Sequence, residues 1–316
     1  MGMSLVVLGL GLVALYIGAD LMIRGASRLA RQLGLNALVI GLTVVAMGTS
    51  TPELLVGVVA SVRDSGDIAI GNVVGSNIAN IALILGIAAL IRPVRIQMRL
   101  LVREVPIMIF AAVAFYLFAY IEGGIDRWDG LALLAGFVAY TLYLLESARR
   151  ESPAIEAGFQ KFVPAGGTLV GHIFLTAIGL GTLLAGAHLV VKSSHDAAEL
   201  LGISDLAVGL TLVALGTSLP ELATAIAASI QDEGDILVGN VVGSNVFNIL
   251  AVLGCSSLAR PIPVSEAVIS VEGPVMLAVS ALLLPFVWTT LRLTRLEGTI
   301  LVAAYIAFVV LLALPS

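Results

Sequence analysis

The chain has little charge and almost no cysteine. Its 316 residues include one cysteine, Cys255, so an internal disulfide is excluded, and no His/Cys cluster with metal-ligand spacing is present. Charged residues make up 12% of the chain, against about 25% in soluble domains, whereas 59% of its residues are hydrophobic. No ATP-binding motif and no nucleophile–histidine pairing appear at membrane depth. These absences argue against a soluble protein and against an enzyme, and they place the chain in a lipid bilayer.

Ten apolar segments are each long enough to cross a hydrocarbon core of about 30 Å. They lie at residues 5–23, 38–61, 68–91, 104–121, 129–146, 168–191, 206–230, 236–259, 267–291 and 298–314. The first segment is not read as a signal peptide, because no Lys or Arg precedes it and three arginines follow it. The sequence therefore predicts an all-α integral membrane protein with ten transmembrane helices.

The two halves of the chain repeat each other at an offset of 168 residues. Across 41–61 and 66–86, 27 of 42 positions are identical to their counterparts in the second half. Each half holds five spans, and this odd number turns the second half upside down relative to the first, as in many secondary transporters. We expect a first five-helix repeat at 1–146 with its motifs at about 37–91, a cytoplasmic connector at 147–166, and a second repeat at 167–316 with its motifs at about 205–259.

Orientation follows from the positions of the basic residues. Of 16 Lys and Arg residues, 12 fall in loops after odd-numbered spans and four in the other loops. By the positive-inside rule the 12-charge side is cytoplasmic. We therefore expect a multi-pass protein of the inner (plasma) membrane with both termini extracytoplasmic.

The repeated motif reads Gly-Thr-Ser-Thr-Pro-Glu at 48–53 and Gly-Thr-Ser-Leu-Pro-Glu at 216–221. Proline removes a backbone donor and is expected to break spans two and seven, which frees carbonyls to line a cavity. A charged carboxylate at this depth costs roughly 2.5 to 3.5 kcal/mol. Helical spacing puts each carboxylate on the same face as two hydroxyls. The residues concerned are Thr49, Ser50 and Glu53, and their counterparts Thr217, Ser218 and Glu221.

The following span in each half carries a polar stripe at steps of four residues. The stripe comprises Asn72, Ser76 and Asn80 in the first half and Asn240, Ser244 and Asn248 in the second. We expect ion contact from the Ser pair and from Asn80 and Asn248, and packing or capping roles for Asn72, Asn240, Asn77 and Asn245. Oxygen ligands without Cys or His favour Ca²⁺ or Na⁺ over Zn²⁺ or Cu²⁺.

At these motifs, together with Gly-Asn-Val-Val-Gly-Ser-Asn at 71–77 and 239–245, the chain resembles the calcium/cation antiporter superfamily, and within it the prokaryotic sodium/calcium exchangers. The resemblance implies ten helices in which spans 2, 3, 7 and 8 enclose the ions while spans 1 and 6 slide across them. It adds the carbonyls of Ala46 and Ala214 to the ion ligands. It also implies exchange of Ca²⁺ for Na⁺ by alternating access, with no cofactor.

The sequence departs from similar exchangers at Asn248, where those have Asp. Two carboxylates remain, which one Ca²⁺ or two monovalent ions neutralise. An H⁺/Ca²⁺ (or other divalent cation) antiporter stays open as an alternative, and a cation channel is a weaker one. The expected partners are Ca²⁺, Na⁺ and the bilayer, without nucleic acid. The oligomeric state stays open, with a monomer as one option.

Overall fold

The computed structural model describes residues 2–159, 167–200, 216–288 and 290–313. In the first half the helices are α1 (Gly2–Gln32), α2 (Ala37–Ile40), α3 (Ala46–Thr49), α4 (Thr51–Val62), α5 (Gly66–Ile78), α6 (Gly86–Ile91), α7 (Val105–Glu122) and α8 (Arg127–Phe159), with π-helical turns η1 (Gly41–Val45), η2 (Ala79–Leu85) and η3 (Leu100–Glu104). In the second half they are α9 (Leu169–Leu200), α11 (Leu219–Ile230), α12 (Gly234–Phe247), α13 (Leu253–Ala259), α14 (Gly273–Trp288) and α15 (Arg295–Ala313), with η4 (Asn248–Val252) and η5 (Val268–Glu272). The short strands are β1 (Val94–Arg95), β2 (Gly124–Ile125), β3 (Ile262–Pro263) and β4 (Arg292–Leu293).

The described residues contain eight helices that are long and apolar enough to cross a membrane, or nine if the bent pair Ala37–Thr49 and Thr51–Val62 counts as one span. The prediction of an all-α membrane protein is therefore confirmed at this level. Of the expected seventh span, 206–230, the structure describes the part from 216 onward, including the apolar helix α11. Helix α8 continues to Phe159, so part of the 147–166 segment, expected as a surface linker, is helical.

The helices that carry the motifs form the centre of the bundle. In the span Gly234–Ala259 the whole apolar window is buried, and in Gly66–Ile91 72% of it is, against 22% in Arg127–Ala148. Backbone approaches backbone where α2 and η1 cross α12, because a Cβ on Gly239 would lie 2.7 Å from the carbonyl oxygen of Leu38 in α2 and 3.0 Å from the backbone nitrogen of Leu42 in η1. Small residues allow such contacts between membrane helices. The outer helices leave apolar side chains exposed, as a lipid-facing surface requires.

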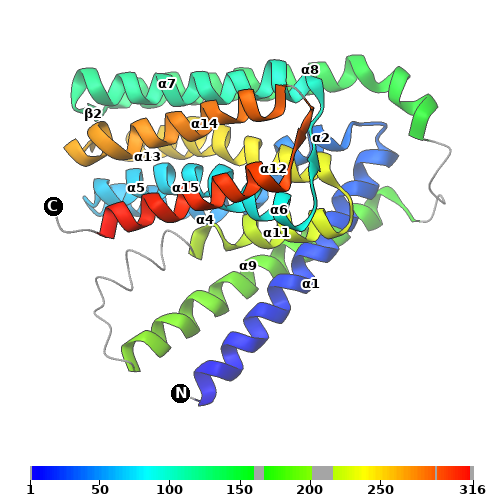
Figure 1. Ribbon diagram of the computed structural model, residues 1–316, viewed down its shortest axis with the longest axis horizontal. Coiled ribbons are helices and arrows are strands. Elements are labelled where there is room, and N and C mark those ends of the chain that lie inside the picture. Colours follow the sequence, from blue (N-terminus) through cyan, green and yellow to red (C-terminus); the bar gives the residue numbers. More distant parts are fainter. Residues whose placement is uncertain (1, 160–166, 201–215, 289, 314–316) are drawn as a thin grey trace.

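Helices α1 and α9 lie side by side and project away from the remaining helices (Figure 1). Their backbones meet at glycines. A Cβ on Gly18 would collide with the backbone of Leu183, and one on Gly179 with the backbone of Met22. This pair depends on glycine because any larger side chain would separate the two helices.

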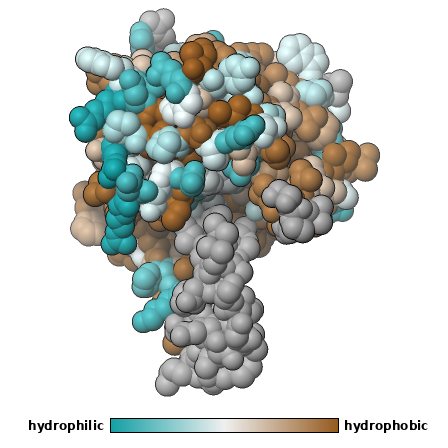
Figure 2. Space-filling model, turned by 90° about the vertical axis from the view of Figure 1, so that its left-hand side faces the viewer, coloured by the Kyte–Doolittle hydropathy of each residue, from teal (hydrophilic) through white to brown (hydrophobic). Residues whose placement is uncertain are grey.

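Two strand pairs join the halves at opposite ends of the bundle. Strand β1 pairs with β4 and β2 with β3, both antiparallel, and the first pair becomes the second when every position is shifted by 168 residues between halves. Figure 1 places β2 at the left-hand end, where α15 ends, and β1 with β4 at the right-hand end. Figure 2 looks onto the left-hand end, where hydrophilic residues gather over the bundle beside hydrophobic ones.

Candidate cation site

Both motif helices are interrupted at the serine of the motif. The axes of Ala37–Thr49 and Thr51–Val62 differ by 46°, and Ser50 between them has φ −84° and ψ 11°. Ser218 has nearly the same backbone angles, φ −87° and ψ 4°, directly before α11. In both cases the motif proline stands in the first turn of the next helix, where its missing N–H costs no helical hydrogen bond. The expected break in span two is therefore present, and the described part of span seven has matching geometry.

The break places a carboxylate at the start of each second half-helix. Glu53 lies in the first turn of α4 and Glu221 in the first turn of α11. The amino-terminal end of a helix carries partial positive charge, which stabilises a nearby carboxylate. Both side chains have 0% exposure. Each carboxylate is thus buried next to the amino-terminal end of the helix that carries it.

Each motif serine contacts the glutamate of the other half. The Ser50 hydroxyl donates to Glu221 Oε1 at 2.8 Å, and Ser218 donates to Glu53 Oε1 at 3.4 Å. The stripe serines complete the same arrangement. Ser50 lies 2.9 Å from Ser244, Ser218 lies 3.1 Å from Ser76, and Ser76 lies 3.5 Å from Glu53 Oε1. The contacts therefore form two equivalent groups, each of which joins the carboxylate and stripe serine of one half to the motif serine of the other half.

The motif threonines are anchored by asparagines that the sequence pointed to only as packing or capping residues. Thr49 donates to Asn240 Oδ1 and Thr217 to Asn72 Oδ1, each at 3.1 Å. Asn72 also donates to the backbone carbonyl of Glu53 at 3.2 Å. These amides therefore fix the broken helices against α5 and α12 at the level of the carboxylates.

Asn80 and Asn248 stand at π-helical turns and are oriented by a second pair of amides. Asn80 donates from Nδ2 to Asn245 Oδ1 at 2.9 Å, and Asn248 donates from Nδ2 to Asn77 Oδ1 at 3.2 Å. Asn77 and Asn245 in turn donate to each other's backbone carbonyl, each at 3.3 Å. A π turn adds one residue to a helix and changes the direction of the side chains that follow, and such turns recur at functional sites. The turns η2 and η4 therefore contribute to the positions of Asn80 and Asn248. No residue pattern in the sequence indicates them.

Four buried oxygens of this group lack a hydrogen-bond donor. They are Glu53 Oε2, Glu221 Oε2, Asn80 Oδ1 and Asn248 Oδ1. Buried polar atoms are normally satisfied, and an unpartnered buried acceptor is costly. The four form two pairs related by the 168-residue offset, and all belong to residue types that bind hard cations. This donor set suits Ca²⁺ or Na⁺.

Of the two expected backbone ligands, the carbonyls of Ala46 and Ala214, the structure describes only that of Ala46. The Ala46 carbonyl accepts the Ser50 N–H at 3.0 Å and lies 3.4 Å from the Thr49 hydroxyl. This oxygen, which the family resemblance adds to the ion ligands, thus accepts hydrogen bonds within the broken helix. Ala214, its counterpart, lies outside the described residues.

Known proteins are similar to this chain over nearly its whole length. The model of the sodium/calcium exchanger protein family matches residues 3–146 and again 171–314. The sodium/calcium exchanger MaX1 of Methanosarcina acetivorans is 38% identical, covering 98% of both chains. The putative antiporter CaxA of Alkalimonas amylolytica is 36% identical, covering 96% of both.

A solved structure has the same fold. The sodium-calcium exchanger NCX_Mj, soaked with Na⁺ and Sr²⁺, superimposes with a TM-score of 0.85 at 32% identity, covering 97% of each chain. Sequence and fold agree over the whole length, and the family resemblance read from the two motifs is confirmed. The chain belongs to the sodium/calcium exchanger protein family.

Proposed function

We propose that this chain is a secondary antiporter that exchanges Ca²⁺ for Na⁺ across a membrane by alternating access. Relatives named as sodium/calcium exchangers, similar over nearly the whole chain, support this activity. The chain is accordingly a transporter, not an enzyme, and its ions are substrates. The observation that carries the proposal is the set of four unpartnered buried oxygens, supplied equally by the two halves.

The proposed ion ligands are the residues predicted from the motifs, together with two backbone carbonyls that the family resemblance adds. The carboxylates Glu53 and Glu221 supply charge, and hydroxyls and amides supply further oxygens. The full set is Glu53, Glu221, Thr49, Thr217, Ser50, Ser218, Ser76, Ser244, Asn80, Asn248 and the carbonyls of Ala46 and Ala214. The contacts that join the hydroxyls to the carboxylates support it, and the unpartnered amide oxygens give Asn80 and Asn248 a role at the ion.

The two carboxylates also explain why transport is coupled. A closed, dehydrated state with both glutamates ionised and no cation buries uncompensated charge, at a cost of several kcal/mol per ion. One Ca²⁺ or two monovalent ions remove that cost. Only loaded forms then change sides, so one ion must replace the other before the protein returns.

The proposed architecture is ten helices in two inverted five-helix repeats. In its favour, the family model matches twice, starting at residues 3 and 171, which are 168 apart. Equivalent strands β1 and β3 also lie at opposite ends of the bundle, as inversion requires. We further propose that the protein lies in the plasma membrane with its β1·β4 end on the cytoplasmic side and both termini outside. The excess of Lys and Arg in the loops at the β1·β4 end supports this orientation.

Flux measurements test the function. The purified protein is reconstituted into proteoliposomes, and Ca²⁺ uptake is recorded under an imposed Na⁺ gradient, an imposed H⁺ gradient, or neither. We expect uptake with the Na⁺ gradient alone. Uptake driven only by H⁺ would establish the proton-coupled alternative, and steady Ca²⁺ conductance without any counter-ion would identify a channel.

A further inference from the structure

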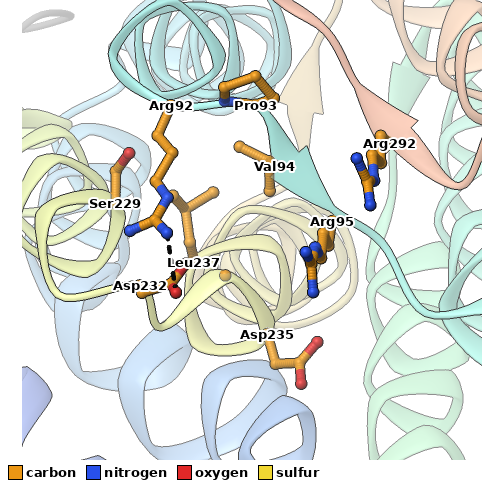
Figure 3. A pocket seen from close by; sticks show the side chains of 10 residues that line it. Arg92, Pro93, Val94, Arg95, Ser229, Asp232, Asp235, Leu237 and Arg292 are labelled. Carbon is orange, nitrogen blue, oxygen red and sulfur yellow. Dashed lines mark hydrogen bonds and ion pairs between the residues drawn. The ribbon is translucent and has the colours of Figure 1, made fainter.

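A polar pocket of about 370 Å³ opens at the β1·β4 end of the bundle, away from the cation site (Figure 3). It is bounded by the turn before α12, by β1 and by β4, so three separate loops meet there. Its charged side chains are Arg92, Arg95, Arg292, Asp232 and Asp235. Nothing in the transport cycle proposed above uses these residues.

Two of the three arginines have no acidic partner among the described residues. Arg92 forms an ion pair with Asp232 at 3.0 Å. Asp235 accepts a hydrogen bond from Gln97 Nε2 at 2.8 Å. Figure 3 shows the guanidinium group of Arg95 on the side of Asp235, whereas Arg292 lies beyond Arg95 and away from both aspartates. Three arginines against two aspartates leave the pocket with a formal net charge of +1, and Arg292 lies away from both carboxylates.

The strand pairing brings these two arginines together. Arg95 and Arg292 are directly opposite in the antiparallel register of β1 and β4. Like charges at opposite positions destabilise a strand pair. At the other end of the bundle the equivalent register joins Gly124 and Pro263, so this fold forms the pair without any arginine. The strand pairing therefore does not require two arginines at opposite positions, although the positive-inside rule favours basic residues at this end in general.

We propose that Arg95 and Arg292 form a binding site for a phosphate group. Guanidinium groups bind phosphate oxygens in a bidentate manner, and two of them at opposite strand positions offer donors to one phosphate group. Basic pockets between membrane helices bind the headgroups of anionic lipids. The neighbouring exposed apolar side chains Ile91 and Leu296, 40% and 72% exposed, would contact acyl chains. The chemistry recognised is phosphate, from a lipid headgroup or from solution.

The test compares the full-length protein in detergent with the double variant Arg95→Gln/Arg292→Gln. In one arm, phosphatidylglycerol or phosphatidylcholine is added and bound lipid is counted by native mass spectrometry. In the other arm, inorganic phosphate is titrated by calorimetry. We expect the protein to bind phosphate or to prefer phosphatidylglycerol, and the double variant to bind about tenfold more weakly. Binding in the lipid arm alone identifies a headgroup site, and binding in the phosphate arm identifies a soluble ligand.

A matched control removes the same charge elsewhere. Arg28→Gln/Arg103→Gln deletes two exposed arginines that also follow odd-numbered spans but do not line the pocket. It should bind both probes like the unmodified protein. Equal binding by the unmodified protein and the Arg95/Arg292 variant overturns the proposal, and so does an equal loss in the control. If the double variant melts at a lower temperature, the single variant Arg292→Gln replaces it and should still bind several-fold more weakly.

Discussion

The hydroxyl of Ser50, in the first half of the chain, donates a hydrogen bond of 2.8 Å to Oε1 of Glu221 in the second half. Its counterpart Ser218 lies 3.4 Å from Glu53 Oε1. Each carboxylate is thus held by the broken helix of the other repeat. Neither half of the site is therefore independent of the other. Replacing either glutamate also removes the acceptor of a serine hydroxyl in the opposite motif.

We predict that Glu53→Gln and Glu221→Gln each reduce Ca²⁺ exchange by about 100-fold or more, equivalent to about 3 kcal/mol of lost interaction with the ion. Glutamine keeps the size of the side chain but removes half of the charge that offsets Ca²⁺ dehydration. Uptake by purified, reconstituted variants measures the effect. Glu266→Gln, an exposed acid outside the site, is the control. Near-normal uptake by either site variant removes that carboxylate from the ion ligands.

Much of the site could be read from the sequence because its chemistry is local. The order Thr-Ser-x-Pro-Glu fixes both the helix break and the face shared by hydroxyls and carboxylate. Because the motif is repeated 168 residues later, the sequence also indicates two broken helices whose carboxylates contribute to one site. What the sequence could not give is which atoms pair across the halves, such as Thr49 with Asn240, because these contacts depend on how α12 packs against the broken helix.

The role of Asn77 and Asn245 shows the same limit. Helical spacing turns both away from the polar stripe, so a packing role was the natural interpretation. In the structure they accept hydrogen bonds from the amide nitrogens of Asn248 and Asn80 and leave the side-chain oxygens of those two residues without a partner. The π turns that start near these positions add a residue to the helix, which changes the directions expected from a regular spacing of 3.6.

The packing of α1 against α9 yields a stability prediction. A Cβ on Gly18 would collide with the Leu183 backbone, whereas one on Gly9 would meet nothing within 4 Å. We predict that Gly18→Ala lowers stability by about 1 to 3 kcal/mol through overpacking. Gly9→Ala should be neutral or stabilising by up to about 1 kcal/mol, because alanine favours helix. Thermal unfolding of both variants in the same detergent provides the comparison. A Gly18→Ala protein as stable as the Gly9→Ala protein would contradict the close contact.

The proposed topology predicts which ends can be labelled from outside. After Cys255→Ala, Trp128→Cys should react with an impermeant thiol reagent in intact cells, because Trp128 is 76% exposed beside β2 at the extracytoplasmic end. Arg103→Cys, exposed at the opposite end, should react only after lysis. The reverse pattern would mean that the 12-to-4 bias of basic residues does not set the orientation.

Asn248 provides the sharpest test of the two-carboxylate charge balance. Asn248→Asp introduces a third potential negative charge and replaces the amide nitrogen that donates to Asn77 Oδ1 at 3.2 Å. Loss of that hydrogen bond should cost about 1 to 3 kcal/mol unless the Asn77 amide turns over. Like charges in a low-dielectric site stay ionised only with extra cations, so the variant should bind an additional monovalent ion or a proton.

Exchange by the Asn248→Asp protein should therefore depend more strongly on pH, K⁺ or membrane voltage than exchange by the unmodified protein. Flux in proteoliposomes, measured across pH and K⁺ concentration and at clamped voltages, tests this directly. Asn80→Asp is the matched variant, because Asn80 occupies the equivalent position and donates to Asn245 Oδ1 at 2.9 Å. If the Asn248→Asp protein kept the Ca²⁺ affinity and all three dependences of the unmodified protein, Asn248 would be a packing residue, since an added charge beside the ions cannot leave every one of these quantities unchanged.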